Sequence, residues 1–255
     1  LDQHSGVAVS YGIAAADIAE LRAEEAPDIS ACAFKLPASA PASMTTKNGL
    51  ADATRLLREK GPAAFKTGDE IEVIHELGKT RWTVIGIDCD ELPGREHALT
   101  IMNTTPLAGH CFDAPDLKNP FGRNRWHASS ARAYLNGEFL DGFTELDRQA
   151  IGESTRRTYS FTEKEYIHTT EKLFLLSASE AGFEVGGDVQ DEGKVYPYFK
   201  TGEEARQLSD KDGEARYWWL RSPRPWGGNG VRLVAPSGAL SSYHGANVGS
   251  AVAAA

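Results

Sequence analysis

The sequence predicts an α+β domain over residues 63–255, built from antiparallel strands with flanking helices. Three observations lead to this class. Residues 68–91 hold two runs of β-favouring residues joined by a turn at 77–79, which is the pattern of a hairpin. Residues 129–151 carry apolar residues at helical spacing. Residues 217–235 read as strands again. Antiparallel strands with helices set to one side define the α+β class.

Residues 1–62 are expected to form a helical and linker segment outside that domain. Residues 12–25 have apolar positions at helical spacing, and Pro27 ends this first helix. Residues 34–44 contain prolines among small residues, which is typical of an extended linker. A second helix is predicted over 45–61, where basic residues come late and a glycine closes the segment.

The domain itself is expected to mix strands, loops and helices. Residues 104–129 are predicted to be a long irregular loop because three prolines interrupt them. A helix is predicted to follow a serine cap, and another begins after Thr144 with acidic residues in its first turn. The other predicted elements are strands at 97–103, 157–161, 172–177, 217–222 and 230–235, a short helix at 178–183 and a turn at 236–239.

The acidic balance of the chain limits its partners. It carries 27 Lys and Arg against 36 Asp and Glu, a net charge of −9. Because nucleic-acid binding requires clustered cations, no nucleic acid is expected as a partner. No apolar run approaches the roughly 20 residues that span a bilayer, so no membrane span is expected. Cys32, Cys89 and Cys111 are widely spaced, so buried or idle thiols are expected rather than a zinc site or disulfide framework.

Four blocks of the sequence carry a family resemblance. They are GDEIEVI…TRWTVIGID at 68–88, WHASSARAYLNGEFLDGFTELDRQAI at 126–151, TTEKLFLLSASEAG at 169–182 and YWWLRSP at 217–223. In this order they resemble a bacterial and phage domain built on the C-type lectin fold, which implies a C-type-lectin-like domain after the N-terminal segment. That domain recurs among variable proteins of diversity-generating retroelements. In those proteins adenine-directed mutagenesis diversifies surface residues of a C-terminal block, which here corresponds to about 217–255.

The composition of that C-terminal block agrees with the resemblance. It contains no Asp, Glu or Lys, and its only formal charges are three arginines. Mutagenesis of AAC-type codons yields residues such as Asn, Ser, Tyr, His, Gly, Ala, Leu and Arg, but not Trp or Lys. The predicted ligand-binding residues are Arg224, Trp226, Gly227, Gly228, Asn229, Gly230, Leu233, Ala235, Ser241, Ser242, Tyr243 and His244.

We expect these residues to form one exposed patch on a rigid scaffold. The tryptophans at 218–219 supply buried area for a central strand. Arg221 and Ser222 are expected to tie down the loop that follows. Leu233 and Ala235 are two residues apart, so they are predicted to share one exposed face of a strand. Small polar side chains and tyrosine on a rigid scaffold are typical of paratopes.

The predicted function is that of a receptor-type variable protein that binds a macromolecule. Its target would be a protein or glycan on a cell surface, and its location a virion, a cell surface or the extracellular space. A non-diversified module of the same family with a fixed ligand is the first alternative. The second is an enzyme, because the formylglycine-generating enzymes share the broad fold. It would use His110, Cys111, Asp113 and Asp116, but their spacing fits no template, so no catalytic residue, metal or cofactor is expected.

Many lectins of this fold bind sugars through a calcium ion, so the sequence is also examined for calcium ligands. The ion needs several oxygen ligands, typically including carboxylates. Residues 217–255 contain no carboxylate side chain, so a calcium-bridged sugar site is not expected there. The acidic stretch 188–193 is expected to be a solvated turn, with a structural calcium as the alternative.

Overall fold

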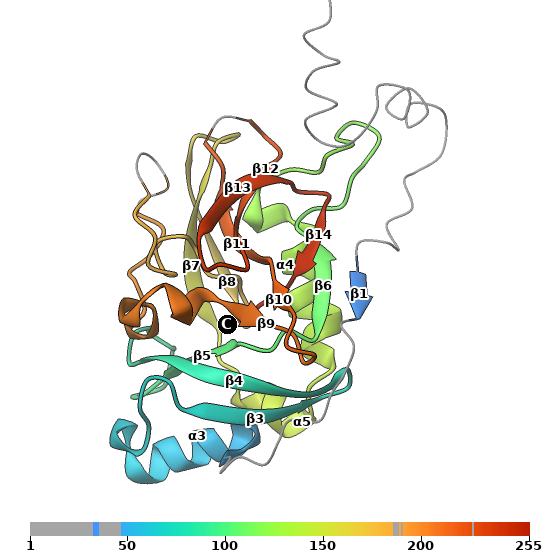
Figure 1. The fold of residues 1–255 in the computed structure, drawn as a ribbon. Helices are drawn as coiled ribbons and strands as arrows, with labels where there is room; N and C mark the ends of the chain where they lie inside the picture. The colour runs from blue at the N-terminus through green and yellow to red at the C-terminus, as the bar shows by residue number, and fades with distance from the viewer. Residues whose placement is uncertain (1–32, 36–46, 186–188, 190, 226) are drawn as a thin grey trace, which may run out of the picture.

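The computed structural model of the chain describes residues 33–35, 47–185, 189, 191–225 and 227–255, with backbone alone at 33–35, 47–48 and 242–244. Over these residues the fold is of mixed α and β type, with mostly antiparallel sheets and few helices, as predicted (Figure 1). The helix predicted at 12–25 and most of the predicted linker lie outside the described residues.

A six-stranded sheet carries the tryptophan pair. Its order is β1-β6-β14-β11-β12-β13, with β1 at Ala33–Lys35, β6 at Ala108–Cys111, β14 at Gly249–Ala251, β11 at Trp218–Pro223, β12 at Gly230–Val234 and β13 at Leu240–Gly245. Strand β11 is therefore an interior strand, antiparallel to β12 and parallel to β14. The predicted strands at 217–222 and 230–235 are confirmed, as is the turn between β12 and β13.

A second sheet lies beside two helices. Its order is β2-β3-β4-β5, with β2 at Lys47–Asn48, β3 at Glu70–His75, β4 at Gly78–Ile87 and β5 at Leu99–Asn103. Strands β3 and β4 form the predicted hairpin, in which His75 is paired with Gly78. Gly78 has a φ of 134°, a backbone conformation that favours glycine. Helices α3 (Gly49–Lys60) and α5 (Glu145–Ala150) contact each other beside this sheet, at the bottom of Figure 1.

The remaining elements are short. Two antiparallel pairs complete the strands, β7 (Ser154–Ser160) with β8 (Glu165–Glu171) and β9 (Leu208–Ser209) with β10 (Ala215–Arg216). Helix α4 (Ser130–Tyr134) continues as the π-helix η4 (Leu135–Phe139), and 3-10 turns lie at Pro62–Ala64 (η2), Trp126–Ala128 (η3), Pro197–Thr201 (η6) and Glu203–Arg206 (η7). Both predicted helix caps are confirmed, because the hydroxyls of Ser129 and Thr144 accept backbone N–H groups at 3.2 Å.

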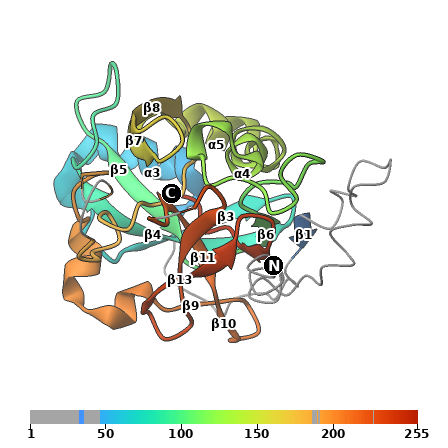
Figure 2. The same cartoon turned by 90° about the horizontal axis from the view of Figure 1, so that it is seen from above.

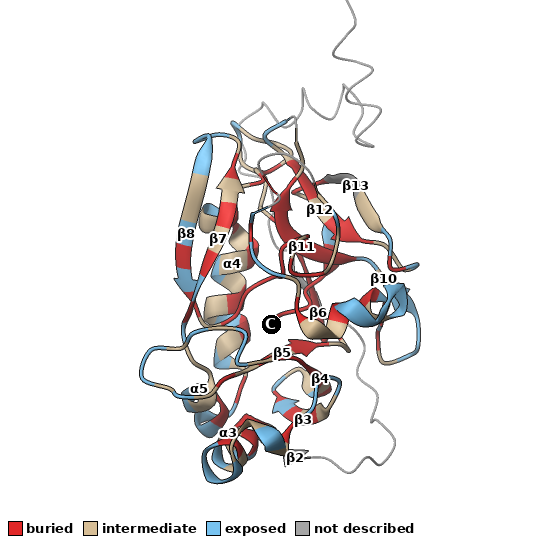
Figure 3. Cartoon of the chain, turned by 90° about the vertical axis from the view of Figure 1, so that its left-hand side faces the viewer, coloured by how far each residue is buried: buried red, intermediate tan, exposed pale blue. Residues whose placement is uncertain are grey.

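One hydrophobic core connects the sheets and the helices, and buried positions follow β11 and its neighbours in Figure 3. Trp218 and Trp219 have no exposed surface, which confirms their predicted burial. Their indole N–H groups donate to the carbonyls of Arg206 and His110, each at 2.9 Å. Burial therefore leaves neither indole donor unsatisfied.

Helix α3 is part of this core, although the sequence assigned it to a segment outside the domain. Leu50, Ala53 and Leu57 are buried against the sheet and α5. The Asp147 carboxylate of α5 accepts the Ala51 N–H at 3.0 Å, at the start of α3. The amphipathic pattern predicted the helix correctly but does not say which surface its apolar face meets. Residues 49–60 thus lie with the domain rather than outside it.

The segment 172–177 is extended but is not the predicted strand. Most of its backbone groups bond to side chains and to the last residues, and its one bond to a neighbouring strand joins the Leu176 carbonyl to the Arg221 N–H of β11 at 2.8 Å. The Asn136 amide oxygen accepts the N–H groups of Lys172 and Leu173 at 2.9 and 3.1 Å. Phe174 and Ala255 exchange two backbone bonds at 2.9 and 3.0 Å. These partners are distant in the sequence. The local apolar pattern therefore predicted a strand paired with a neighbouring strand.

Three further local predictions differ from the structure. Strand β6 lies within residues 104–129, which were expected to be an irregular loop. Strand β8 was not predicted, and residues 178–183 form turns rather than a helix. No helix of the described residues is both long and apolar enough to cross a membrane.

Cys111 departs from the prediction of idle thiols. It has no exposed surface and is disulfide-bonded. Its partner is not Cys89, which is a free cysteine. Wide spacing along the chain therefore does not exclude a disulfide, because the fold brings distant residues together.

Candidate functional site

Three loops meet at the end of the six-stranded sheet that lies at the top of Figure 1 and faces the viewer in Figure 2. They are residues 113–125, 224–229 and 245–249, which we call the loop cluster. Backbone bonds join them in series: Ala246 N–H donates to the Asn229 carbonyl at 2.8 Å, and Asp113 N–H donates to the Ala246 carbonyl at 2.9 Å. The three loops therefore form one connected unit.

Asn124 is the centre of the loop cluster. Its side chain is 1% exposed, and its amide nitrogen donates to the carbonyls of Gly227 and Gly230, both at 2.9 Å. Its backbone N–H donates to the Gly228 carbonyl at 2.8 Å. Asn124 therefore ties the glycine-rich loop to residues 113–125, together with the Arg224 N–H, which also donates to the Gly230 carbonyl at 2.9 Å.

Glycines shape the loop cluster at two positions. Gly227 has a φ of 115°, which a side chain rarely adopts. Gly122 has a φ of 65°, and a Cβ there would lie 2.4 Å from the Asp113 carbonyl oxygen. Gly228 differs from both, since a Cβ would meet nothing within 4 Å. A side chain is therefore tolerated at 228 but not at the other two positions.

The loop cluster contains several of the predicted ligand-binding residues. Gly227 and Gly228 are exposed, and Arg224 and Asn229 are half-buried. Gly230 is buried at the start of β12, and Trp226 lies outside the described residues. Two apolar side chains that were not predicted are also exposed here, Leu117 at 55% and Val248 at 38%.

The other predicted residues do not join this surface, so the prediction of a single exposed patch is wrong. Leu233 has no exposed surface and is paired with Trp219, because β12 is an interior strand with both faces covered. Ala235 is half-buried at the opposite end of β12, where its N–H donates to the Ala239 carbonyl. Ser241 is half-buried opposite Leu233. Side chains at 242–244 lie outside the described residues.

Residues 103–252, more than half of the chain, match the family described as Domain of unknown function (DUF6273). The chain belongs to the DUF6273 family. No curated protein matches it, and no solved structure does. The match includes the whole loop cluster and excludes α3, β3 and β4.

The DUF6273 region also contains a buried ionic network that the sequence analysis missed. Arg221 has no exposed surface and forms two bonds to the Glu180 carboxylate at 2.5 and 2.7 Å. Its remaining donors reach the carbonyls of Leu175 and Glu192 at 2.7 and 2.8 Å. Arg221 and Ser222 were expected to tie down the following loop. Instead they hold the preceding segment, since Ser222 accepts the Ala178 N–H at 2.8 Å.

Glu192 is the second buried acid of this network. It was expected in a solvated acidic turn, yet it is only 1% exposed. Its carboxylate accepts the Tyr159 N–H at 2.8 Å and bonds to the Ser222 hydroxyl. Burial raises the pKa of Glu192 to about 7, and the bond from Ser222 and the charge of Arg221 offset only part of that increase. Its neighbour Asp191 is exposed and pairs with Arg157 at 3.0 Å.

The loop from His110 to Asp116 was the candidate catalytic loop of the enzyme alternative. In this DUF6273 chain its side chains make structural contacts. His110 is buried, its ring stacks on Tyr134, and burial lowers its pKa. Asp113 accepts the N–H groups of Arg123 and Ser130 at 2.8 and 3.2 Å, and burial raises its pKa. Among the described residues no three His, Cys, Asp or Glu side chains gather in a way that would hold a metal ion.

Proposed function

We propose that this protein binds a macromolecular target, a protein or glycan on a cell surface, through the loop cluster. The observation that carries the proposal is the buried Asn124 clamp beneath an exposed glycine-rich loop. A loop that is exposed yet held in one conformation loses little conformational entropy on binding. Rigid support under small exposed residues is also the arrangement of a paratope.

We assign the fold itself, within the proposal, to the C-type-lectin-like class. The four sequence blocks support this: in order they fall on β3 and β4, on α4 to α5, on the end of β8 with the segment after it, and on β11. A disulfide at Cys111 favours an oxidising location such as the cell surface or the extracellular space.

Two versions of this function differ in whether the surface is diversified. In the first, the chain is a variable protein of a diversity-generating retroelement, and variation is confined to exposed positions such as Gly228. In the second, the ligand is fixed. The burial of Leu233 in the middle of the block favours the second version, because variation there would disturb the core. A reverse transcriptase gene and a near-identical template repeat beside the coding region support the first version, and their absence supports the second.

The test of binding places a photo-crosslinking residue at position 228. Gly228 is exposed and a Cβ there meets no atom within 4 Å, so benzoylphenylalanine is placed at this position, and the same residue at Leu146, which is 67% exposed on α5, serves as the control. Both variants are irradiated with intact cells and with an immobilised glycan panel. We expect crosslinks from position 228 that unlabelled protein competes away, and none from position 146. Equal crosslinking from both positions, or none from either, overturns the proposal.

A further inference from the structure

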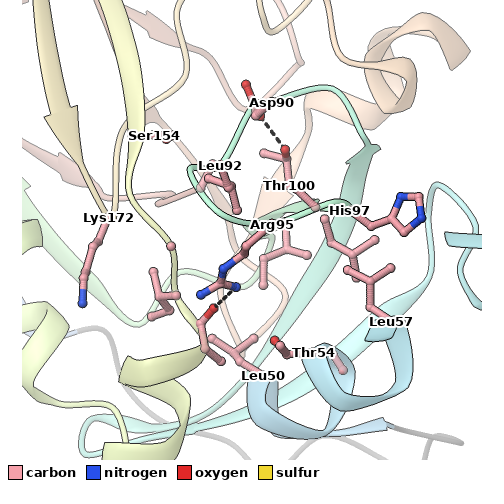
Figure 4. A pocket seen from close by; sticks show the side chains of 18 of the residues that line it. Leu50, Thr54, Leu57, Asp90, Leu92, Arg95, His97, Thr100, Ser154 and Lys172 are labelled. Atoms are coloured by element: carbon pink, nitrogen blue, oxygen red, sulfur yellow. Dashed lines mark hydrogen bonds between the residues drawn. The ribbon is translucent and has the colours of Figure 1, made fainter. Parts of the chain in front are cut away.

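A cavity of about 450 Å³ lies between α3, β5 and the segments 150–156 and 172–174 (Figure 4). Its volume falls within the range of about 300–1,000 Å³ that is usual for small-molecule sites. It adjoins α3 at the bottom of Figure 1, whereas the loop cluster is at the top. An occupant of this cavity is therefore independent of the proposed function of the loop cluster.

The inner wall of the cavity is apolar and contains one unsatisfied donor. Leu50 and Leu57 of α3, Ile71 of β3 and Phe174 line it and are all buried. Trp82 also lines it and is 1% exposed, and its indole N–H has no hydrogen-bond partner among the described residues. This contrasts with the other buried indoles at 126, 218 and 219, each of which donates to an oxygen. A buried donor without an acceptor is rare and unfavourable, so an acceptor from an occupant would stabilise this site.

Cations without carboxylate partners also line the cavity. Arg58, Arg95 and Lys172 form no ion pair in the described part of the chain. Arg95 donates instead to the carbonyls of Ala150 and Gln149 at 2.7 and 3.5 Å, at the end of α5. Burial lowers the pKa of the Arg95 guanidinium, and the like charge of Arg58 lowers it further. An anion between these groups would relieve both effects.

The acidic side chains of the cavity do not cancel this charge. Asp90 is already paired with Arg156 at 2.9 Å and accepts hydrogen bonds from Thr100 and Tyr196. Glu96 is the other acid of the lining and is exposed. Figure 4 shows Arg95 and Lys172 among the lining side chains, with Leu50 and Leu57 on the α3 side. The cavity thus combines an apolar wall with unpaired positive charge.

We propose that this cavity binds a small apolar molecule that carries one anionic headgroup, a carboxylate or a phosphate. The apolar body lies against Leu50, Leu57 and Trp82, and the headgroup lies at Arg95 and Lys172. Hydrogen bonds between a cation and an anionic group are shorter and stronger than neutral ones. They therefore select the anion over a neutral molecule of the same length.

The test measures binding of four decyl compounds by isothermal titration calorimetry, each below its micelle concentration. They are decanoate, decyl phosphate, decanol and decyltrimethylammonium. We expect decanoate or decyl phosphate to bind at least roughly tenfold more tightly than decanol, as charge-assisted bonds imply, and the cation to bind least. The tighter of the two anions identifies the headgroup. Equal affinity for decanol, or tighter binding of the cation, overturns the proposal.

Variants then place the binding in this cavity. Lys172→Gln is expected to weaken binding of the preferred anion roughly tenfold, whereas Lys66→Gln, which removes an exposed lysine outside the cavity, leaves it unchanged. Thr54→Phe fills the cavity from α3 and is expected to abolish binding, with Thr162→Phe on the exposed β7–β8 turn as its control. Circular dichroism establishes that each variant is folded. Binding that survives both Lys172→Gln and Thr54→Phe overturns the assignment.

Discussion

Arg221 shows how much of this structure depends on single buried charges. Its guanidinium has no contact with solvent and donates to Glu180, to backbone carbonyls and, at 3.0 Å, to the hydroxyl of Thr158. A buried cation of this kind is tolerated when every donor has an acceptor. In the sequence, Arg221 is one residue of a predicted strand, and no neighbouring residue indicates that Glu180 is its partner. Local pattern therefore predicted the strand but not the ion pair.

Replacing Arg221 by Met should destabilise the protein strongly. The Glu180 carboxylate would keep only Arg156, at 3.6 Å, as a buried charged partner. Breaking a buried pair in this way costs about 3–5 kcal/mol. Urea denaturation measures the free energy of unfolding, and Arg55→Met on the exposed face of α3 should change it by less than about 1 kcal/mol.

The double variant Arg221→Met with Glu180→Leu keeps this prediction testable if the single variant does not fold. It removes both charges, so it should regain part of the lost free energy of unfolding. A single variant as stable as the unmodified protein, or a double variant no better than the single one, would contradict the assignment of a coupled pair.

The raised pKa of Glu192 predicts that the free energy of unfolding falls as the pH rises. Its pKa is raised to about 7 in the folded protein, above the ordinary glutamate value of 4.5. Below pH 4.5 the carboxyl is protonated in both states, and the full stabilisation is present. As pH rises toward 7 the unfolded chain loses this proton first, so the free energy of unfolding falls. The change amounts to about 3 kcal/mol and levels off above pH 7.

The variant Glu192→Gln isolates this contribution, because the amide does not titrate. Urea denaturation of both proteins at several pH values between 4.5 and 8 gives the difference in free energy of unfolding. That difference should change between pH 4.5 and about 7 and then level off. Glu165→Gln, which changes an exposed acid on β8, should leave the pH profile as it was. Parallel profiles for the Glu192 variant and the unmodified protein would contradict the raised pKa.

At the scale of secondary-structure elements, the predictions were correct where a short stretch of the sequence carries the signal. The β3–β4 hairpin follows from alternation and a glycine at its turn, and α5 follows from a threonine cap with acidic residues behind it. Strand β6, with the sequence Ala-Gly-His-Cys, has no such local signal, whereas β8 was missed although its Tyr, Ile and Thr residues favour a strand. The extended segment 172–177 shows the reverse case, since its apolar run predicts a strand while Asn136 takes its backbone groups.

The candidate site, too, was predicted where the signal is local and missed where it depends on distant residues. The glycine-rich loop at 227–230 was predicted from composition, and the structure places most of it in the loop cluster. The Asn124 clamp was not predicted, because the sequence does not distinguish a buried asparagine in a loop from an exposed one. The exposure of Leu233 was inferred from its period-two relation to Ala235. That inference fails because alternation predicts exposure only for a strand with one open face, and β12 has none.

Asn124→Ala should loosen the loop cluster without unfolding the protein. It leaves the Gly227 and Gly230 carbonyls without their side-chain donor, at a cost of about 1–3 kcal/mol. Hydrogen exchange of peptides covering 224–230 and 245–249 should therefore accelerate, by roughly 5- to 150-fold.

The matched control is Asn136→Ala, which removes an equivalent amide from another part of the fold. It should accelerate exchange at 172–173, where its side chain accepts two N–H groups, and leave the loop cluster unchanged. If the two variants give the same exchange pattern, the loops are not held by Asn124.

At the scale of the whole molecule, the disulfide at Cys111 fixes part of the six-stranded sheet. Alkylation of the native protein should label Cys89 and leave Cys111 unlabelled, as measured by mass spectrometry of the peptides. Burial raises the pKa of the Cys89 thiol, so labelling near neutral pH should be slower than for an exposed cysteine. Reduction should lower the free energy of unfolding by about 2–5 kcal/mol. Labelling of Cys111 before reduction would contradict the disulfide.

The position of β6 between β1 and β14 has a consequence for the time course of folding. His110 is paired with Ala33 on one side and with Ser250 on the other. During synthesis at about 5–20 residues per second, the second of these partners is made on the order of ten seconds after β6 itself. Throughout that interval one edge of β6 has no strand beside it, and β11 lacks its parallel neighbour. The sheet therefore cannot be completed before Gly249–Ala251 is synthesised, and until then the open edge of β6 is available for mispairing.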